Sequence, residues 1–279
     1  IMSGILYLVA TPIGNLEDIT IRALNTLKNV DIIAAEDTRH TLGLLNHFEI
    51  KKPLISYYKE IEKSKSQVLI NELLDGKNIA LVSDSGTPGI SDPGEEIVTV
   101  AIENGIQVVP IPGACALINA LIASGLATKE FEFIGFLGGT QSEKRAKLNE
   151  LMFDTRTMIF YEAPHRIEST LNLMKEVFGE DRGVVVAKEL TKIHEFFYRG
   201  ILSTISEQIV DFKGEYVIII EGSKLSKKEN EINNLSNMDL DSHYEYYNKK
   251  GMDKKDIIKQ IAKDRNVSKN EIYQYFIKK

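Results

Sequence analysis

The sequence predicts an α/β protein of two domains with a small helical module at its C-terminal end. Three observations lead to this prediction. Strand-like apolar runs in the first half end in turns of small residues that lead into helix-like segments, which is the pattern of parallel strand–helix units. The second half mixes alternating and continuous apolar runs, as a mixed sheet with helices would. The last residues carry two short amphipathic helical patterns behind a polar stretch.

The bulk numbers agree with this class. The chain has 279 residues, enough for two domains of ordinary size, and 43% of them are hydrophobic. We expect an N-terminal α/β domain at 1–127, a second α/β domain at 128–223, a linker at 224–248 and a helix-turn-helix tail at 249–279.

Composition also bounds the compartment and the partners. The single cysteine, Cys115, excludes an internal disulfide and fits a reducing compartment. No apolar run approaches the roughly 18 residues of a membrane span. The apolar run 5–10 lacks a preceding basic region, which argues against a signal peptide. The net charge of −6 does not indicate a nucleic-acid binder, although net charge says little about local patches. We therefore expect a cytoplasmic protein.

The first half begins with two buried strands at 5–10 and 30–35. The first ends in a Pro/Gly turn at 11–15, which does not contain the dinucleotide-binding G-x-G-x-x-G pattern. The second ends on a polar run that contains Asp37 and Arg39. Helix capping accounts for Asp37 but leaves Arg39 unexplained, so structural and functional roles both remain open.

The longest turn of the first half, residues 82–94, follows a buried strand at 79–82 and contains three glycines and two prolines. Ordinary connections take about 2–6 residues, and this one is about twice as long. We predict that it binds a ligand, because open α/β sheets bind ligands at the carboxyl ends of their strands. At its end Asp92 is expected to cap the next helix, with Glu95 completing a capping box. A third small-residue turn, at 110–114, follows the strand at 106–109.

The second half and the tail are less regular. Strands are expected at 131–136, 158–161, 184–187, 195–200 and 215–221, and helices at 142–151 and 164–178. The polar stretch 223–237 indicates a linker. In the tail, Ile257, Ile258, Ile261 and Ala262 form one helical face and Ile272, Tyr273, Phe276 and Ile277 another. From residue 249 onward ten Lys and Arg stand against four Asp and Glu. That excess fits a solvated packing module and contact with nucleic-acid phosphates equally well.

Six motifs together closely resemble the ribosomal RNA small subunit methyltransferase I family, a branch of the tetrapyrrole methylases. They are 10–16 (ATPIGNL), 35–39 (AEDTR), 83–94 (SDSGTPGISDPG), 161–167 (YEAPHRI), 188–195 (KELTKIHE) and 214–217 (GEYV). Each motif alone is weak, whereas six in this order are specific. The resemblance runs from about residue 5 to 222, and the tail resembles the helix-turn-helix appendage of the family.

The resemblance implies a two-domain class III methyltransferase, a homodimer that binds S-adenosylmethionine in the cleft between its domains. The implied reaction is 2′-O-methylation of a cytidine in the decoding region of small-subunit (16S) ribosomal RNA. Carried over by motif, the cofactor-binding residues are Ile13, Gly14, Ser85, Gly86, Thr87, Ile90, Cys115, Ala116 and Glu162. The candidate catalytic residues are Asp37, Arg39, Glu162, Lys188 and Glu189, among which the sequence does not identify a base. No cluster of residues shows metal-ligand spacing, so no metal site is predicted.

Two segments depart from the family pattern. Where the family has an aromatic-His segment after the third strand, this chain has residues 57–59 (YYK), so any role for a histidine there is lost. Residues 137–141 (LGGTQ) are less basic than expected, which weakens the case for RNA contact through that loop.

Two alternative functions remain open. A tetrapyrrole (precorrin-type) methyltransferase would use the same cleft, and a non-catalytic nucleic-acid-binding regulator would explain the basic tail. A non-catalytic regulator, however, would not explain why three small-residue turns converge. A nicotinamide-dependent enzyme is disfavoured because its glycine pattern is absent.

Overall fold

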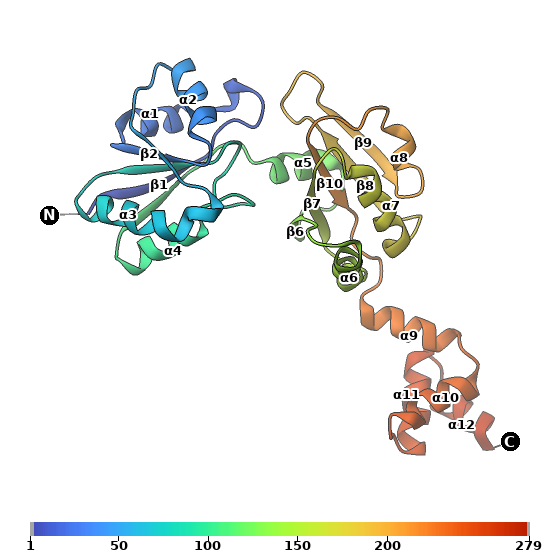
Figure 1. Cartoon of the computed structure of the whole chain (residues 1–279). Coiled ribbons are helices and arrows are strands. Elements are labelled where there is room, and N and C mark those ends of the chain that lie inside the picture. The colour runs from blue at the N-terminus through green and yellow to red at the C-terminus, as the bar shows by residue number, and fades with distance from the viewer. Residues whose placement is uncertain (1–2, 278–279) are drawn as a thin grey trace.

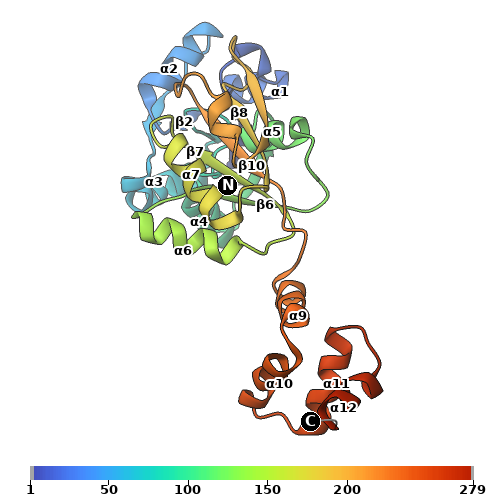
Figure 2. The same ribbon diagram turned by 90° about the vertical axis from the view of Figure 1, so that its right-hand side faces the viewer.

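The computed structural model describes residues 3–277 and shows two five-stranded sheets followed by a helical module (Figure 1). The predicted α/β class with two sheets is confirmed. The two sheets with their helices lie side by side, and a 90° turn shows that one stretch of chain joins the helical module to the rest (Figure 2). Within residues 3–277 we find no helix that combines the length and apolarity of a membrane span.

The first sheet is parallel throughout, in the order β3-β2-β4-β1-β5. Its strands are β1 Ile5–Val9, β2 Ile32–Ala35, β3 Leu54–Ser56, β4 Ile79–Val82 and β5 Gln107–Ile111. The helices are η1 Leu16–Asp18, α1 Ile21–Asn29, α2 Thr38–His47, η2 Lys59–Ile61, α3 Glu62–Leu74 and α4 Glu95–Glu103. One apolar cluster lies under α1 and α2 and another under α3 and α4, so both faces of the sheet are covered (Figure 1). Because β1 leads to one side of the sheet and β4 to the other, their carboxyl ends form a topological switch point.

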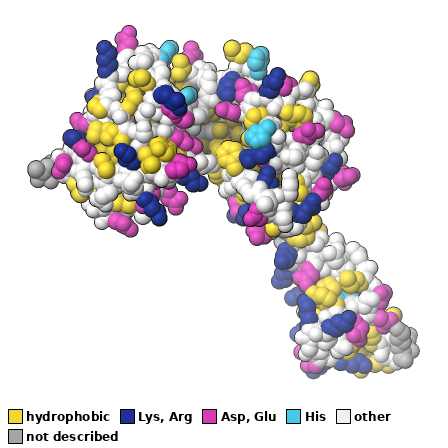
Figure 3. Space-filling view, in the orientation of Figure 1, with side chains coloured by type: hydrophobic (Ala, Val, Ile, Leu, Met, Phe, Trp, Pro, Cys, Tyr) yellow, Lys and Arg dark blue, Asp and Glu magenta, His cyan; other side chains and the backbone are white. Residues whose placement is uncertain are grey.

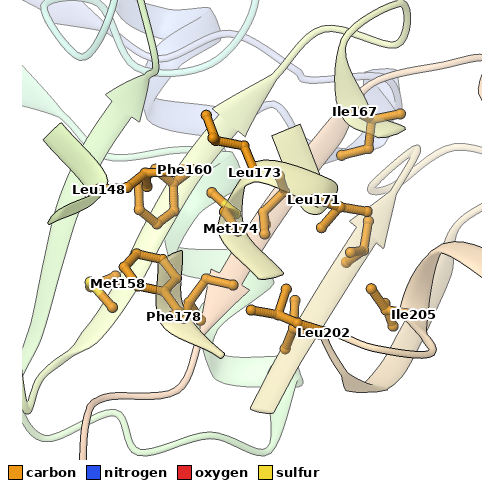
Figure 4. Close-up of a cluster of buried hydrophobic side chains, with 14 of the residues drawn as sticks. Leu148, Met158, Phe160, Ile167, Leu171, Leu173, Met174, Phe178, Leu202 and Ile205 are labelled. Carbon is orange, nitrogen blue, oxygen red and sulfur yellow. The ribbon is translucent and has the colours of Figure 1, made fainter. Parts of the chain in front are cut away.

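The second sheet is mixed, in the order β6-β7-β10-β8-β9, with only β6 and β7 parallel. Its strands are β6 Phe131–Phe136, β7 Thr157–Glu162, β8 Gly183–Lys188, β9 Phe196–Ile201 and β10 Tyr216–Ile220. Helices α6 Gln141–Leu151, α7 Ile167–Phe178 and α8 Ile205–Gln208 complete it. Side chains from α6, α7 and the sheet form a continuous apolar core that includes Phe160, Leu171 and Met174 (Figure 4).

Helix α5, Ala116–Ser124, joins the two sheets. The sequence places it in the first domain, but its buried face packs on the second sheet against β7, β8 and β10. Leu117, Ala120 and Leu121 share one apolar cluster with Ile159 and Ile219. The contacts of α5 therefore fix one sheet next to the other.

The expected cap at the start of α4 is wrong. Gly94, not Asp92, is the N-cap, and its backbone N–H donates to Glu62 Oε1 at 2.9 Å. Gly94 has a φ of 150°, and a side chain there would press on Leu81. The loop therefore extends to Gly94, and Asp92 does not cap the helix.

The expected linker at 224–248 is also wrong, since most of it is helical. The module contains α9 Lys227–Asn237, α10 Leu240–Lys249, α11 Lys254–Asp264 and α12 Lys269–Ile277. Ser226 and Glu229 form a capping box at the start of α9, a signal that the polar composition concealed. Leu235 and Tyr247 from the expected linker pack into the same core as Ile257 and Ile261. The face predicted around Ile257 is buried, but of the second predicted face only Ile272 is.

A buried polar network stabilises this module. His243 Nε2 lies 3.1 Å from Asp264 Oδ2, and neither side chain is more than 1% exposed. Arg265 Nε donates to His243 Nδ1 at 3.2 Å, so Nε2 must carry the ring proton and donate to Asp264. Tyr247 Oη donates to the same carboxylate at 2.6 Å. Burial lowers the pKa of His243, against the opposing effect of Asp264.

We predict that the helical module loses stability as pH falls below about 6.5, the ordinary histidine pKa, since the unfolded chain then binds a proton that the folded one resists. His243→Leu should destabilise the module by about 1–3 kcal/mol, because it removes one buried hydrogen bond from Asp264 and one from Arg265. Amide hydrogen exchange of α10–α12 in the full chain at pH 5–8 measures both effects. His194→Leu, at an exposed position, is the control. Protection factors, in which the intrinsic rise of the exchange rate with pH is divided out, should show the change; values that are equal at every pH and in both variants would contradict this role.

Candidate active site between the two sheets

Three turns meet at the switch point of the first sheet. The turn after β1 is bridged to the loop after β4 by two backbone hydrogen bonds, Thr11 N to Gly86 O at 2.9 Å and Gly86 N to Thr11 O at 3.1 Å. Thr87 Oγ1 donates to Ala114 O at 3.0 Å and so joins the loop to the turn after β5. The convergence expected from the sequence is therefore present.

A cavity of about 400 Å³ lies between these turns and the second sheet, a volume typical of small-molecule sites. The space-filling view shows the hollow between the two α/β domains (Figure 3). We call it the first cavity. Eight of the nine predicted cofactor-binding residues line it, namely Ile13, Ser85, Gly86, Thr87, Ile90, Cys115, Ala116 and Glu162. The second sheet contributes Phe136, Tyr161 and residues 215–217.

A second cavity of about 650 Å³ adjoins the first and shares Ile13, Ser85 and Glu215 with it. We call it the second cavity. The ninth predicted residue, Gly14, lines this one. Basic and imidazole side chains line it, namely Arg39, His40, His47 and Lys192, together with the acidic Asp84 and Glu215. The first cavity has no basic or imidazole side chain among its described lining residues. The two cavities therefore differ in charge although they share a wall.

Asp37 and Arg39 act as a pair. Asp37 caps α2 by accepting from Arg39 N at 2.8 Å, and its carboxylate also binds the Arg39 guanidinium through Nε at 3.1 Å and Nη2 at 2.9 Å. The Arg39 bonds lower the pKa of Asp37 to about 2. So acidic a carboxylate is a poor proton acceptor. The Arg39 side chain is 90% exposed at the second cavity, which suits it to contact a ligand.

The geometry gives the other three catalytic candidates structural partners. The Glu162 side chain is 1% exposed and accepts from Arg166 Nε at 2.8 Å and Thr170 Oγ1 at 2.6 Å. Lys188 Nζ donates to Asp211 O at 2.9 Å, on the second domain. The five candidates are not brought together at one point. Glu162 and Lys188, like Glu189 described below, direct their polar atoms toward other protein groups.

Glu189 belongs to a short strained segment next to both cavities. Its φ is 52°, and that of Thr191 is 66°, which is unusual for residues with a side chain. Glu189 Oε1 accepts from Glu215 N at 2.8 Å and from Lys192 Nζ at 3.0 Å. Burial raises the pKa of Glu189, but these hydrogen bonds outweigh it and the net shift is downward. The stem of Lys192 covers Gly14, where a side chain would collide with it.

Asp92 and Tyr161 are residues of the first cavity to which the sequence analysis gave no role in binding. Tyr161 Oη accepts from Leu117 N at 3.1 Å and so ties β7 to α5. Burial raises the pKa of Asp92 to about 6, and the nearby carboxylates of Glu36 and Asp84 add to the shift. The signal that identifies Asp92 is its place in the small-residue loop 82–94, which the sequence predicts to bind a ligand, although the capping pattern gives Asp92 itself a structural role.

The chain is similar to several known proteins. A family model described as Tetrapyrrole (Corrin/Porphyrin) Methylases matches residues 5–206. Proteins named ribosomal RNA small subunit methyltransferase I from Halalkalibacterium halodurans and Bacillus subtilis are each 48% identical to the chain. The match covers 98% of this chain and 94% of the first protein, and 99% and 95% for the second. One from Synechocystis is 46% identical over 97% of this chain and 96% of its own length.

Solved structures share the fold at low sequence identity. Diphthine synthase superposes with a TM-score of 0.61 at 16% identity, over 82% of this chain and 94% of its own. Uroporphyrin-III C-methyltransferase from Thermus thermophilus, complexed with S-adenosyl homocysteine, has a TM-score of 0.55 at 18% identity, over 78% of this chain and 97% of its own. These likenesses show the fold of the two sheets.

We predict that Gly86→Val lowers the affinity for S-adenosylmethionine at least about tenfold and leaves the fold intact. The φ of Gly86 is 85°, and an added side chain would meet Ile13 Cγ2 at the cavity wall. Equilibrium binding, together with thermal unfolding, measures both effects. Gly138→Val is the control, because a side chain there meets nothing within 4 Å. Normal binding by Gly86→Val would remove the loop from the binding site.

Proposed function

The chain belongs to the ribosomal RNA small subunit methyltransferase I family, and from this premise we propose that it methylates the ribose 2′-hydroxyl of a cytidine in the decoding region of small-subunit (16S) ribosomal RNA, with S-adenosylmethionine as methyl donor. The observation that carries the proposal is the pair of adjoining cavities. The described lining of the first is largely apolar and has acidic but no basic side chains, whereas the second has basic and imidazole groups beside two acidic ones.

The donor would occupy the first cavity. Ile13 and Ile90 offer apolar contact to an adenine ring, and the small residues of the loop after β4 let ligand atoms approach the backbone. The cofactor supplies the reactive methyl group, so the protein has to bind, orient and exclude water. Aligning the donor with the acceptor hydroxyl can contribute about 7–11 kcal/mol to the lowering of the barrier.

The substrate nucleotide would lie in the second cavity. Arg39 uses Nε and Nη2 on Asp37, and no described hydrogen bond engages its Nη1. A guanidinium held in this way is suited to a phosphate oxygen. Asp37 would then be a positioning residue for Arg39, while His40 and His47 supply further contacts from the same helix.

The helical module would hold the RNA outside the cleft. Lys and Arg side chains line one edge of this module, the left edge in Figure 3, although the chain as a whole is acidic. Such an edge fits contact with backbone phosphates.

We also propose a cytoplasmic homodimer. Ile118 and Ile122 on α5 remain exposed and would suit a protein interface.

Incubation with labelled S-adenosylmethionine and small ribosomal subunits that lack the modification tests the proposal. We expect label at the 2′-oxygen of one cytidine in the decoding region, located by mapping the modified nucleotide. Label in a tetrapyrrole but not in ribosomal RNA would instead support the alternative enzyme. Label in neither, with intact cofactor binding, would contradict both.

In the same assay we predict that Arg39→Ala lowers the methylation rate at least about tenfold and leaves S-adenosylmethionine affinity unchanged, because it removes a substrate contact and none in the first cavity. Arg145→Ala is the matched control, since Arg145 pairs with Glu176 at an exposed site on the second domain. Full activity of the Arg39 variant would remove this residue from the substrate site.

We predict that truncation after residue 223, which removes the whole helical module, weakens binding to the small subunit and reduces its salt dependence. S-Adenosylmethionine affinity should stay unchanged. Removal of 249–279 alone should also destabilise what remains, because it uncovers Leu235. Binding measured between 50 and 200 mM salt gives the slope, which should fall by on the order of one unit for each phosphate that the module neutralises. An unchanged slope would contradict the role of the module in RNA binding.

A further inference from the structure

The acidic residues that line the first cavity favour a positively charged ligand. We propose that Asp92 makes this cavity prefer the positively charged methyl donor over the neutral thioether that remains after methyl transfer. The inference rests on the proposed function, because it requires S-adenosylmethionine in the first cavity. Loss of the methyl group removes the sulfonium charge and leaves the rest of the cofactor unchanged, so a carboxylate near the sulfur can distinguish donor from product.

Asp92 is the carboxylate of the first cavity that stays available. Three acidic residues line the cavity among those described: Asp92, Glu162 and Glu215. The Glu162 carboxylate is turned toward Arg166 and Thr170. The Glu215 side chain is 70% exposed and pairs with Lys192 at 3.1 Å. Among the described residues Glu162 and Glu215 each have a cationic partner, whereas the groups that act on Asp92 are acids and a hydroxyl, so its charge is the least compensated of the three.

The groups that face Asp92 reinforce its charge. Glu36, which follows β2, and Asp84, which follows β4, raise the pKa of Asp92 from the first sheet, and a hydrogen bond from the Ser83 hydroxyl lowers it. Tyr161 on β7 faces it from the second sheet; burial raises the pKa of that phenol, and Cys115 and Asp92 add smaller contributions. None of the described residues that line the first cavity is Lys, Arg or His. A cation entering here therefore meets only neutral or negative groups.

The raised pKa of Asp92 gives the proposal a distinctive pH dependence. Burial and the neighbouring acids bring the pKa to about 6, so Asp92 is ionised at pH 7.5 and largely protonated at pH 5. A bound cation favours the ionised form and lowers the pKa. Affinity for the charged donor should consequently fall as pH drops through 6, by about tenfold per unit at most. The affinity for a ligand that lacks the sulfonium charge should change much less.

The test is equilibrium binding of three ligands to the full-length protein between pH 5 and 8. S-Adenosylmethionine carries the sulfonium, sinefungin replaces it with a charged amine, and S-adenosylhomocysteine has a neutral sulfur. At pH 7.5 Asp92→Asn should weaken the two charged ligands about tenfold and S-adenosylhomocysteine less than about twofold. The variant should also lose most of the pH dependence. Asp75→Asn, remote from both cavities, is the matched control, and thermal unfolding confirms that each variant is folded.

Two outcomes would overturn the inference. Equal weakening of all three ligands would show that Asp92 acts on a group they share or on the loop itself, and unchanged affinities would show that it does not face the ligand. Failure of the wild-type protein to bind S-adenosylmethionine at any pH is a different result, which would overturn the proposed function as well.

Discussion

The site depends on the two hydrogen bonds that tie Thr11 to Gly86. They hold the turn after β1 against the loop after β4 at the switch point of a parallel sheet, and Thr87 extends the connection to the turn after β5. Helix α5, which begins just beyond that turn, packs on the second sheet. The same short segments therefore form one wall of the first cavity and set its distance from the other wall.

The division of charge between the two cavities follows from this geometry. The loop after β4 turns Asp92 toward the first cavity, whereas α2 starts at Asp37 and presents Arg39 to the second. A cationic donor would meet acidic groups in the first cavity, and a polyanionic substrate would meet Arg39 in the second. They would still come close together, because Ile13 and Ser85 belong to both walls.

The sequence predicted the strands and the three converging turns because continuous apolar runs ending in Gly and Pro are strong local signals. It misplaced the cap at Asp92, since the start of α4 is set by Gly94 and its distant partner Glu62. It missed α9 and α10, whose few apolar residues gain a core only by packing on α11 and α12. The partners of Glu162 lie only four and eight residues along the chain, but the sequence did not predict them, because the turn between β7 and α7 decides which side chains return to the carboxylate. Eight of nine predicted cofactor residues line the first cavity, and their role in binding stays a prediction.

The central claim is that donor and nucleotide occupy adjoining cavities with the reacting atoms at their common wall. A structure of the protein with S-adenosylhomocysteine and an RNA fragment containing the target cytidine tests it most directly. We expect the thioether sulfur in the first cavity and the ribose in the second, with its 2′-oxygen placed so that a methyl group on that sulfur would be about 3–3.5 Å away. A cofactor in the second cavity, or a ribose held far from Ile13 and Ser85, would contradict the account.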